Sequence, residues 1–435
     1  MAKLNVFNPN ATVAPGLFAG RVQLVTSVIN KLTQVKMGLS SSFIFSGERG
    51  IGKTALAKFI RYLATHNDKS FGELNFLTSY YAVEKGQSFE YVLQTSLNSL
   101  TDQLPENVLD RLSKRVGNIF KGGKFSIGAF GGNVDVDLGK NESLLKDQHI
   151  KDIAVSIFTN IIRGLEESKD NHSGILIIID EVHNLGDLQG IAMILRNIAT
   201  TLDINELGKV SFLIIGYTDA IELFFDGDQS ARRHFDHYEL GCLTTEDSKE
   251  ILRKGFAGAQ VKIEESIISL AASYSGGYPH AIQVIGHNIL ECDSDEIIDE
   301  KDLSLGLSKT ALELQKKDFL NFYKFGKKPT TKEALLDILA IVGKMTRQEL
   351  SKISEDKNLY RTINDLKKIG AIKEDVENGQ VYLSSMLLAV AIIFHIAPKI
   401  KNDGYLKETM SERNKSLYSA IGENFTEALT QNKSL

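Results

Sequence analysis

The sequence of 435 residues predicts an α/β fold: a parallel sheet carrying the first part of the chain, followed by smaller helical domains. Two apolar runs, residues 41–45 and 175–179, are typical of strands that are buried on both faces of a parallel sheet. A glycine-rich loop, residues 47–54, separates the first run from an amphipathic helical pattern. The length and the hydrophobic content of 43% allow two or three domains with buried cores.

The overall composition excludes several classes of protein. The formal net charge is -5, so any contact with nucleic acid must be local. The chain has two cysteines, Cys242 and Cys292, which excludes a disulfide scaffold or a cysteine-rich zinc site. The first residues show no secretory signal, and the longest apolar run, residues 386–398, is shorter than the roughly 18 residues that a membrane span needs. We therefore expect a cytoplasmic protein without membrane contact.

The loop at residues 47–54 fits the pattern G-x-x-x-x-G-K-[ST]. Glycines let backbone N–H groups surround phosphate oxygens, and the following helix adds its positive end. Lys53 would reach the β- and γ-phosphates of a nucleotide, and Thr54 would ligate Mg²⁺. The alternative is a glycine-rich turn without a ligand. The residues that we expect around the phosphates are Gly47, Gly50, Ile51, Gly52, Lys53, Thr54 and Ala55.

The second apolar run ends in an acidic pair, Asp180 and Glu181. Asp180 would hold Mg²⁺, directly or through water, and Glu181 would orient or deprotonate the attacking water. A strand can end in two acids by chance, but the combination with a phosphate loop upstream is specific. The two motifs predict that the protein binds ATP or GTP and is competent to hydrolyse it.

Three further stretches accompany these motifs: Phe-Ala-Gly-Arg at 18–21, Ile-Ile-Gly-Tyr-Thr-Asp at 214–219 and Gly-Gly-Tyr-Pro-His-Ala-Ile at 276–282. In this order they resemble the AAA+ P-loop ATPases, especially the Orc/Cdc6-like and archaeal-ATPase/STAND branches with a C-terminal winged helix. The resemblance covers roughly residues 16–395. It implies a P-loop NTPase core with a helical lid, and it favours adenine, because no guanine-reading Asn-Lys-x-Asp motif stands out.

The resemblance also implies roles for individual residues. Phe18, Ala19 and Gly20 would lie near adenine, and Thr218 or Asp219 would sense the γ-phosphate. Arg232 or Arg233 would be an arginine finger supplied to a neighbouring subunit; the alternative is a solvated helix end. In the lid, Pro279 and His280 stand where Orc/Cdc6-like proteins carry an arginine pair, which is more similar to the Gly-x-Pro motif of STAND switches. His280 would touch phosphate, or else cap or pack.

The resemblance and the composition together predict six segments. They are an N-terminal segment (1–15), a P-loop ATPase core (16–240) with an inserted hairpin at about 117–140, a helical lid (241–315), a linker (316–330), a winged helix-turn-helix (331–398) and a C-terminal tail or brace (399–435). The hairpin prediction rests on alternating apolar residues on either side of Gly131-Gly132. The hairpin is either a protected surface element or a contact for a partner, a neighbouring subunit or DNA.

The winged-helix prediction rests on three helical patterns, the second opened by a capping box of Thr346 and Glu349, followed by two short strands. In DNA-binding versions the third helix enters the major groove. The basic excess of this region is mild, so docking of a protein, or a structural role, remains the alternative. The residues that we expect to contact double-stranded DNA are Arg347, Arg361, Asn364, Lys367 and Lys368.

Two functions follow from these observations. The first is an ATPase that uses ATP/ADP and Mg²⁺ to couple nucleotide state to assembly, as a homo-oligomer or with a partner protein, and to DNA binding. The second is a STAND-like signalling switch in which ATP/ADP exchange releases a closed form and the winged helix docks protein. A purely structural nucleotide is less consistent with Lys53, the acidic pair and the polar end of the 210–220 strand.

Overall fold

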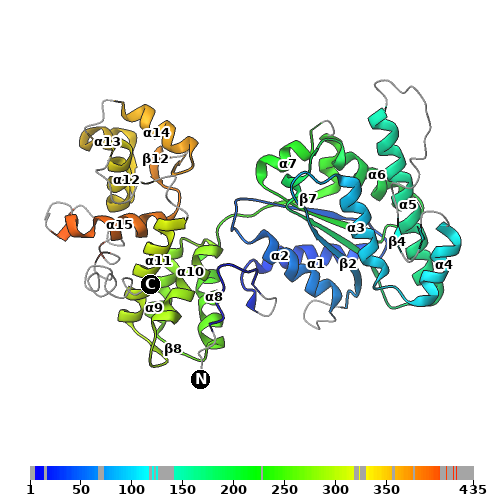
Figure 1. The fold of residues 1–435 in the computed structure, drawn as a ribbon, viewed down its shortest axis with the longest axis horizontal. Coiled ribbons are helices and arrows are strands. Elements are labelled where there is room, and N and C mark those ends of the chain that lie inside the picture. Colours follow the sequence, from blue (N-terminus) through cyan, green and yellow to red (C-terminus); the bar gives the residue numbers. More distant parts are fainter. Residues whose placement is uncertain are drawn as a thin grey trace. The chain divides into compact units, whose positions relative to one another are not determined.

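The computed structural model describes residues 5–13, 17–66, 73–116, 120–121, 124–125, 142–226, 229–317, 323, 330–354, 358–375, 378–401, 408, 415 and 418. The chain divides into two compact units: Ala14–Gly241, and Met1–Val13 together with Cys242–Leu435. Figure 1 shows the elements of both units. Within the described ranges, no helix has both the length and the apolarity that crossing a membrane requires.

A parallel sheet forms the centre of Ala14–Gly241, with the strand order β2-β5-β6-β1-β7 among the described residues. Every residue of β1, β5 and β6 is buried, which explains their unbroken apolar runs. Neighbouring strands are in parallel register, for example Ile44 opposite Ile214 and Ile178 opposite Leu213. The predicted α/β fold with a parallel sheet is confirmed. The strands are β1 (Ser42–Ser46), β2 (Phe76–Ala82), β5 (Gly174–Asp180), β6 (Val210–Ile215) and β7 (Phe235–Glu239).

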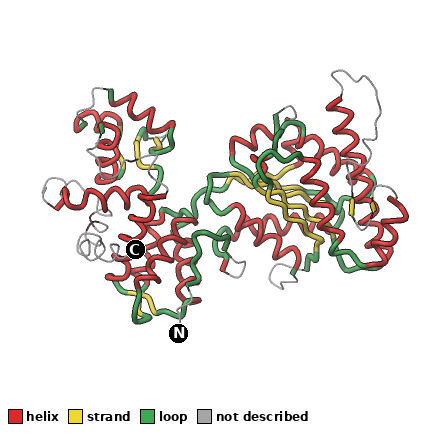
Figure 2. Tube along the Cα trace, viewed as in Figure 1, coloured by secondary structure: helices red, strands yellow, loops and turns green. Residues whose placement is uncertain are grey.

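Helices cover both faces of this sheet (Figure 2). Helices α1 and α2 pack on one face, and α3, α5 and α6 pack on the other, where they bury a continuous aliphatic core. The helices are α1 (Val22–Lys36), α2 (Lys53–Thr65), α3 (Phe89–Thr101), α4 (Glu106–Val116), α5 (Glu142–Ser168), α6 (Ile191–Ile204) and α7 (Thr218–Phe224), with 3₁₀ turns η4 (Val182–Asn184) and η5 (Gln229–His234).

Within the segment 117–140 the structure describes one short strand pair, which lies before the turn that the sequence predicts. Strands β3 (Phe120–Lys121) and β4 (Lys124–Phe125) pair in antiparallel register, with Phe120 opposite Phe125. The predicted turn at Gly131-Gly132 and the arm that follows it lie outside the described residues.

In the second unit, the N-terminal segment packs against the helices that follow Cys242. The ring of Phe7 is 2% exposed and meets Phe256 edge to face, with ring centroids 5.2 Å apart. A Cβ added to Gly255 or Gly286 would lie 2.1 or 2.7 Å from the Phe7 ring, so both glycines are needed for its place. These helices and the short strands between them are α8 (Thr245–Gly258), β8 (Lys262–Ile263), α9 (Glu265–Ser275), α10 (Pro279–Cys292), β9 (Ile297–Ile298) and α11 (Glu300–Lys317).

Residues 331–401 add three helices, a small sheet and a closing helix to the same unit. The capping box appears as predicted: the Glu349 carboxylate accepts from the Thr346 N–H at 2.7 Å, and the Glu349 N–H donates to Thr346 Oγ1 at 3.2 Å. The sheet has a strand that the sequence did not indicate, β10, so its order is β10-β12-β11. The elements are α12 (Thr331–Val342), β10 (Lys344–Thr346), α13 (Arg347–Ile353), α14 (Leu359–Lys368), β11 (Ile372–Glu374), β12 (Gln380–Leu383) and α15 (Met386–Lys401).

Candidate nucleotide-binding site

The sheet brings the predicted motifs of the first unit to one edge. Strands β1, β5 and β6 run parallel, so their carboxyl ends meet at the same side. β1 leads into the loop 47–52 and then α2, β5 ends at Asp180, and β6 ends at Ile215 just before Tyr217. β6 lies between β1 and β5, so the residues after it stand between the loop and the acidic pair.

Three glycines of the loop adopt backbone angles that other residues avoid. The φ angles are 139° at Gly47, 78° at Gly50 and 92° at Gly52. At Gly47, a Cβ would also lie 2.7 Å from the carbonyl oxygen of Leu240. The loop therefore curls tightly between the end of β1 and the first turn of α2, in the conformation that a phosphate-binding loop needs.

Lys53 is folded into this loop and is 6% exposed. Its ammonium donates to the carbonyl oxygens of Gly47 and Glu48, both at 2.8 Å. The same Nζ lies 4.9 Å from the centre of the Tyr217 ring. Burial lowers the pKa of Lys53, while the charges of Glu181 and Asp180 oppose that shift. A buried cation whose hydrogen bonds go to neutral carbonyls is well suited to an anionic ligand.

The carboxylate of Asp180, 1% exposed, gathers three donors from three segments. Thr54 Oγ1 and the Tyr80 hydroxyl each donate to Oδ2 at 2.7 Å, and the Glu181 N–H donates to Oδ1 at 2.8 Å. Burial raises the pKa of Tyr80, and the neighbouring Asp180 charge adds to the effect, so the phenol stays a donor. A buried carboxylate beside a hydroxyl is an oxygen donor set that fits Mg²⁺.

Glu181 follows with a left-handed backbone, φ 59°. Its Oε2 lies 3.0 Å from Nε2 of His183, and the His183 ring lies against the ring of Tyr217 with centroids 4.0 Å apart. Sequence reasoning missed Tyr80, His183 and Tyr217 as parts of this site. A signal was present for His183, two residues after Glu181, and for Tyr217, next to the predicted sensor. Tyr80 carries no such signal, because it is one of two adjacent tyrosines, Tyr80 and Tyr81, near the end of β2.

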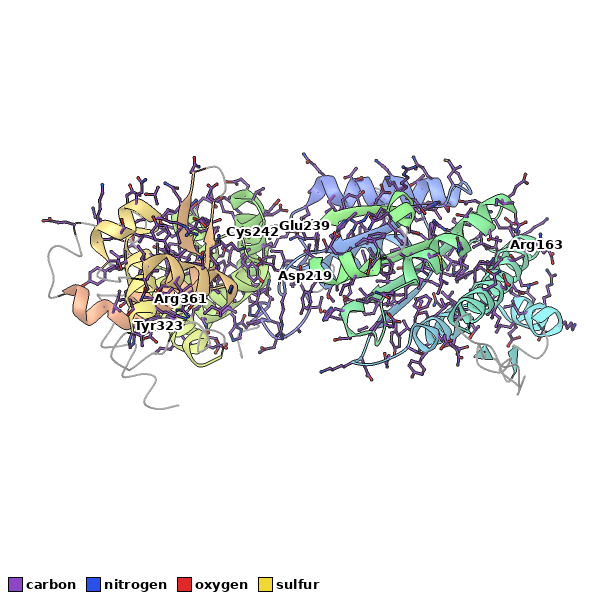
Figure 3. All side chains as sticks on the ribbon, turned by 90° about the horizontal axis from the view of Figure 1, so that it is seen from above. Arg163, Asp219, Glu239, Cys242, Tyr323 and Arg361 are labelled. Atoms are coloured by element: carbon purple, nitrogen blue, oxygen red, sulfur yellow. The ribbon has the colours of Figure 1, made fainter. Side chains whose placement is uncertain are left out.

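Thr218 and Asp219, the predicted sensors, open helix α7. Thr218 Oγ1 donates to Glu239 at the end of β7, at 3.2 Å. Figure 3 shows Asp219 and Glu239 at the same end of this unit, with Arg163 at the opposite end. Among the described contacts it is the preceding residue, Tyr217, that faces the Lys53 ammonium.

The two arginines that the resemblance offered as fingers have different surroundings. Arg232 is half-buried, forms an ion pair with Glu222 and lies over the Phe225 ring at 4.7 Å. The hydrogen bond from Arg232 holds the pKa of Glu222 below its usual value. Arg233 is exposed, and no hydrogen bond of its side chain appears within the described residues. Arg233 is thus the one that is presented to solvent.

The turn at 18–21 lies beside the loop. Arg21, which is left-handed like Gly20, donates from Nη2 to the carbonyl oxygens of Ile51 at 2.7 Å and Gly241 at 2.9 Å. The Phe18 ring stacks on Phe59 of α2, with centroids 4.4 Å apart. The turn is therefore attached to both the loop and the first helix after it.

The other predicted nucleotide contacts belong to the second unit. Pro279 is the first residue of α10, where its missing N–H costs nothing, and His280 follows it. The preceding Gly277 has φ 75°, and its carbonyl accepts from the Leu243 N–H at 2.7 Å.

The predicted DNA-contacting residues lie in residues 347–368, and several are held by one acid. Glu374 on β11 accepts from Arg347 at 2.6 and 2.8 Å and from Lys367 at 2.6 Å. Arg347 also donates to Asn364 at 3.3 Å. These hydrogen bonds, that from Arg347 first, lower the pKa of Glu374 to about 2. Two further residues of the predicted set, Arg361 and Lys368, are exposed.

No family model matches this sequence, and no curated protein is significantly similar to it. Solved structures that resemble it include a Walker-type ATPase of Pyrococcus abyssi (15% identity over 89% of this chain and 99% of that chain, TM-score 0.49). Others are the Aeropyrum pernix ORC2 protein, in ADPNP–ADP complexes (14%, 92% and 99%, TM-score 0.49), and Cdc6p from Pyrobaculum aerophilum (14%, 98% and 98%, TM-score 0.41). They include chains of the Orc and Cdc6 kind, the branch that the sequence motifs resemble.

Proposed function

We propose that this protein binds ATP with Mg²⁺ at the loop 47–54 and hydrolyses it to ADP and phosphate. The observation that carries the proposal is the 2.7 Å contact between Thr54 Oγ1 and Asp180 Oδ2, made beside the buried Lys53 ammonium. Two motifs 126 residues apart in sequence meet here, and each supplies the group that the chemistry requires. A glycine-rich turn that binds no ligand would not require Thr54 to lie beside Asp180.

Each residue has a definite task in this proposal. The Lys53 ammonium and the N–H groups of residues 50–55 neutralise and orient the phosphates. Thr54 and Asp180 hold Mg²⁺, which when bound draws charge from the phosphate oxygens. Glu181 accepts the proton of the attacking water. Phe18, Ala19 and Gly20 lie on the turn attached to the loop, where the resemblance places adenine.

Calorimetry with Mg-ATP tests the binding step. Lys53→Ala should abolish the binding heat, because the loop then lacks its only buried ammonium within the described residues. The control is Lys36→Ala, which removes an exposed lysine bonded to the Glu73 carbonyl. If the wild-type protein gives no heat with either Mg-ATP or Mg-ADP, the proposal is wrong.

We place this activity in the cytoplasm. The two free thiols, one of them exposed, suit a reducing compartment.

For the wider role, we propose that nucleotide state controls assembly and the contacts of residues 331–398. The exposed Arg361 and Lys368 support contact with double-stranded DNA, and the exposed Arg233 supports assembly into a homo-oligomer. The STAND-like switch is supported by Pro279 and by Glu374, which neutralises two of the cations that DNA would need. Duplex DNA that changes turnover or assembly favours the first role. Tightly held ADP with little turnover favours the switch.

A further inference from the structure

The turn after the acidic strand is fixed more firmly than a surface turn needs. The Gly86 N–H donates to the Asn184 carbonyl at 2.8 Å, the Gly186 N–H donates to the Gln87 carbonyl at 3.0 Å, and Asn184 Nδ2 donates to the Val83 carbonyl at 2.9 Å. These bonds tie the turn to the segment after β2. The position of His183, in the middle of the turn, is therefore set by the backbone.

The end of β6 approaches the same turn closely. A Cβ on Gly216 would lie 2.8 Å from Val182 Cγ2 and 3.3 Å from the Ile221 side chain, so only glycine permits this approach. As a result the Tyr217 ring lies against the His183 ring, 4.0 Å between centroids and tilted by 32°. The imidazole is held by the turn on one side and by an aromatic face on the other.

One ring nitrogen of His183 faces the proposed base. Nε2 lies 3.0 Å from Glu181 Oε2, whereas Nδ1 is buried and has no hydrogen-bond partner within the described residues. The Nε2–H tautomer accounts for both facts, because its N–H meets the carboxylate. The Glu181 side chain is itself 38% exposed, so it has room to change rotamer when this contact is removed.

We propose that His183 is a positioning residue for Glu181, and that Tyr217 holds the His183 imidazole in place for this task. The inference rests on the proposed ATPase function and adds how the catalytic base, Glu181, is held in position. A carboxylate that must take a proton from water gains rate from being held in one orientation. The loss of His183 leaves the carboxylate present but free to turn away.

Tyr217 also connects this pair to the phosphate loop. The Lys53 ammonium lies 4.9 Å from the Tyr217 ring centre and donates to two loop carbonyls. Phosphates that bind Lys53 must replace part of this arrangement, which changes the cation that faces Tyr217. Nucleotide binding at the loop therefore changes the surroundings of the Tyr217 ring, against which the His183 ring packs.

Steady-state and single-turnover hydrolysis test the role of His183. His183→Ala should lower kcat by about tenfold, less than the 10²–10⁴-fold attributed to a general base, with the Kd for Mg-ATP unchanged. His183→Gln, which can offer an N–H near the same place, should recover part of the loss. In a Glu181→Gln background, His183→Ala should have no further effect, because the group that it positions is gone.

The chain offers a matched control in the stack of Tyr62 and His66, whose ring centroids lie 4.3 Å apart on the exposed side of α2. His66→Ala removes a histidine from a similar stack and should leave kcat unchanged. The sequence has no tryptophan, so Tyr217→Trp provides a single tryptophan at the site, whose emission can be excited apart from that of the tyrosines. Its emission should shift when Mg-ATP is added.

The outcomes separate this inference from the proposed function. If the wild-type protein neither binds nor hydrolyses ATP, the proposed function fails. If it hydrolyses ATP but the losses from His183→Ala and Glu181→Gln multiply, His183 acts independently of Glu181 and the inference is overturned. Unchanged kcat in His183→Ala, or unchanged Tyr217→Trp emission with bound Mg-ATP, also overturns it.

Discussion

The phosphate loop of the first unit and the helix α14 of the second differ in what happens to their predicted binding residues. Around the loop, Lys53, Thr54 and Asp180 converge on one place. Near α14, Arg347 and Lys367 converge instead on an acid of the same module, Glu374. The difference teaches that a motif with fixed spacing constrains the backbone and hence the site. The availability of single cations such as Arg347 and Lys367 depends instead on neighbours that no spacing reveals.

The comparison would fail most clearly if the residues that meet at the loop were not needed for hydrolysis. Glu181→Gln should bind Mg-ATP as the wild type does but lower single-turnover hydrolysis by up to about 10⁴-fold, because the base is lost. Quenched-flow measurement of labelled ATP provides the rate. Hydrolysis at the wild-type rate would remove Glu181 from its role.

The two arginines of η5 give the next largest effect. Arg233→Ala should lower turnover by about 10³-fold, and only at concentrations where the protein assembles, because a finger acts on a neighbour's site. Arg232→Ala is the matched control: its ion pair with Glu222 is internal, so it should alter stability more than turnover. Equal turnover losses in both variants would contradict this distinction.

The next prediction concerns the surface near α14, where Glu374 neutralises Arg347 and Lys367. Glu374→Gln frees Arg347 and Lys367, so affinity for duplex DNA should rise by about tenfold and the slope of log K against log salt should steepen by about 1–2. Asp365→Asn, which changes the net charge equally but releases Lys332, should have a smaller effect. Fluorescence anisotropy at several salt concentrations measures both. Unchanged DNA affinity in Glu374→Gln would favour a protein partner.

The ion pairs of Glu374 predict that the stability of the folded protein depends on pH. The pKa of Glu374 falls from an ordinary 4.5 to about 2 in the folded state, so its contribution to stability is present above pH 4.5 and is lost as the pH falls toward 2. Denaturant unfolding should show Glu374→Gln less stable than the wild type at pH 7, with the gap closing at low pH. A gap that is constant with pH would contradict the ion pairs.

The smallest expected effect concerns the cap of α13. Thr346→Ala should destabilise the second unit by about 1 kcal/mol, since its hydroxyl accepts from the Glu349 N–H at 3.2 Å. Thermal unfolding followed by circular dichroism measures the change. ATP binding should be unaffected, and a loss of binding would link the cap to the loop.

The sequence predicts the parallel sheet and the meeting of Thr54 with Asp180, because buried strands and a glycine-rich loop follow local rules of backbone geometry. It does not predict β10, since Lys344–Thr346 is too short to show a period and owes its strand form to pairing with β12. Tyr80 was missed for a similar reason. Its role arises from the order of strands, because β2 pairs with β5 and so brings the Tyr80 hydroxyl to Asp180.

The place of Phe7 has a consequence for how the chain is made. Its carbonyl accepts from His287, 280 residues further along, and its ring needs Gly286 beside it. During synthesis Phe7 leaves the ribosome 280 residues before His287, so the groups that bury its ring are made only later. Until then the phenyl group of Phe7 has none of these partners, and the packing of α8 and α10 around it comes late in folding.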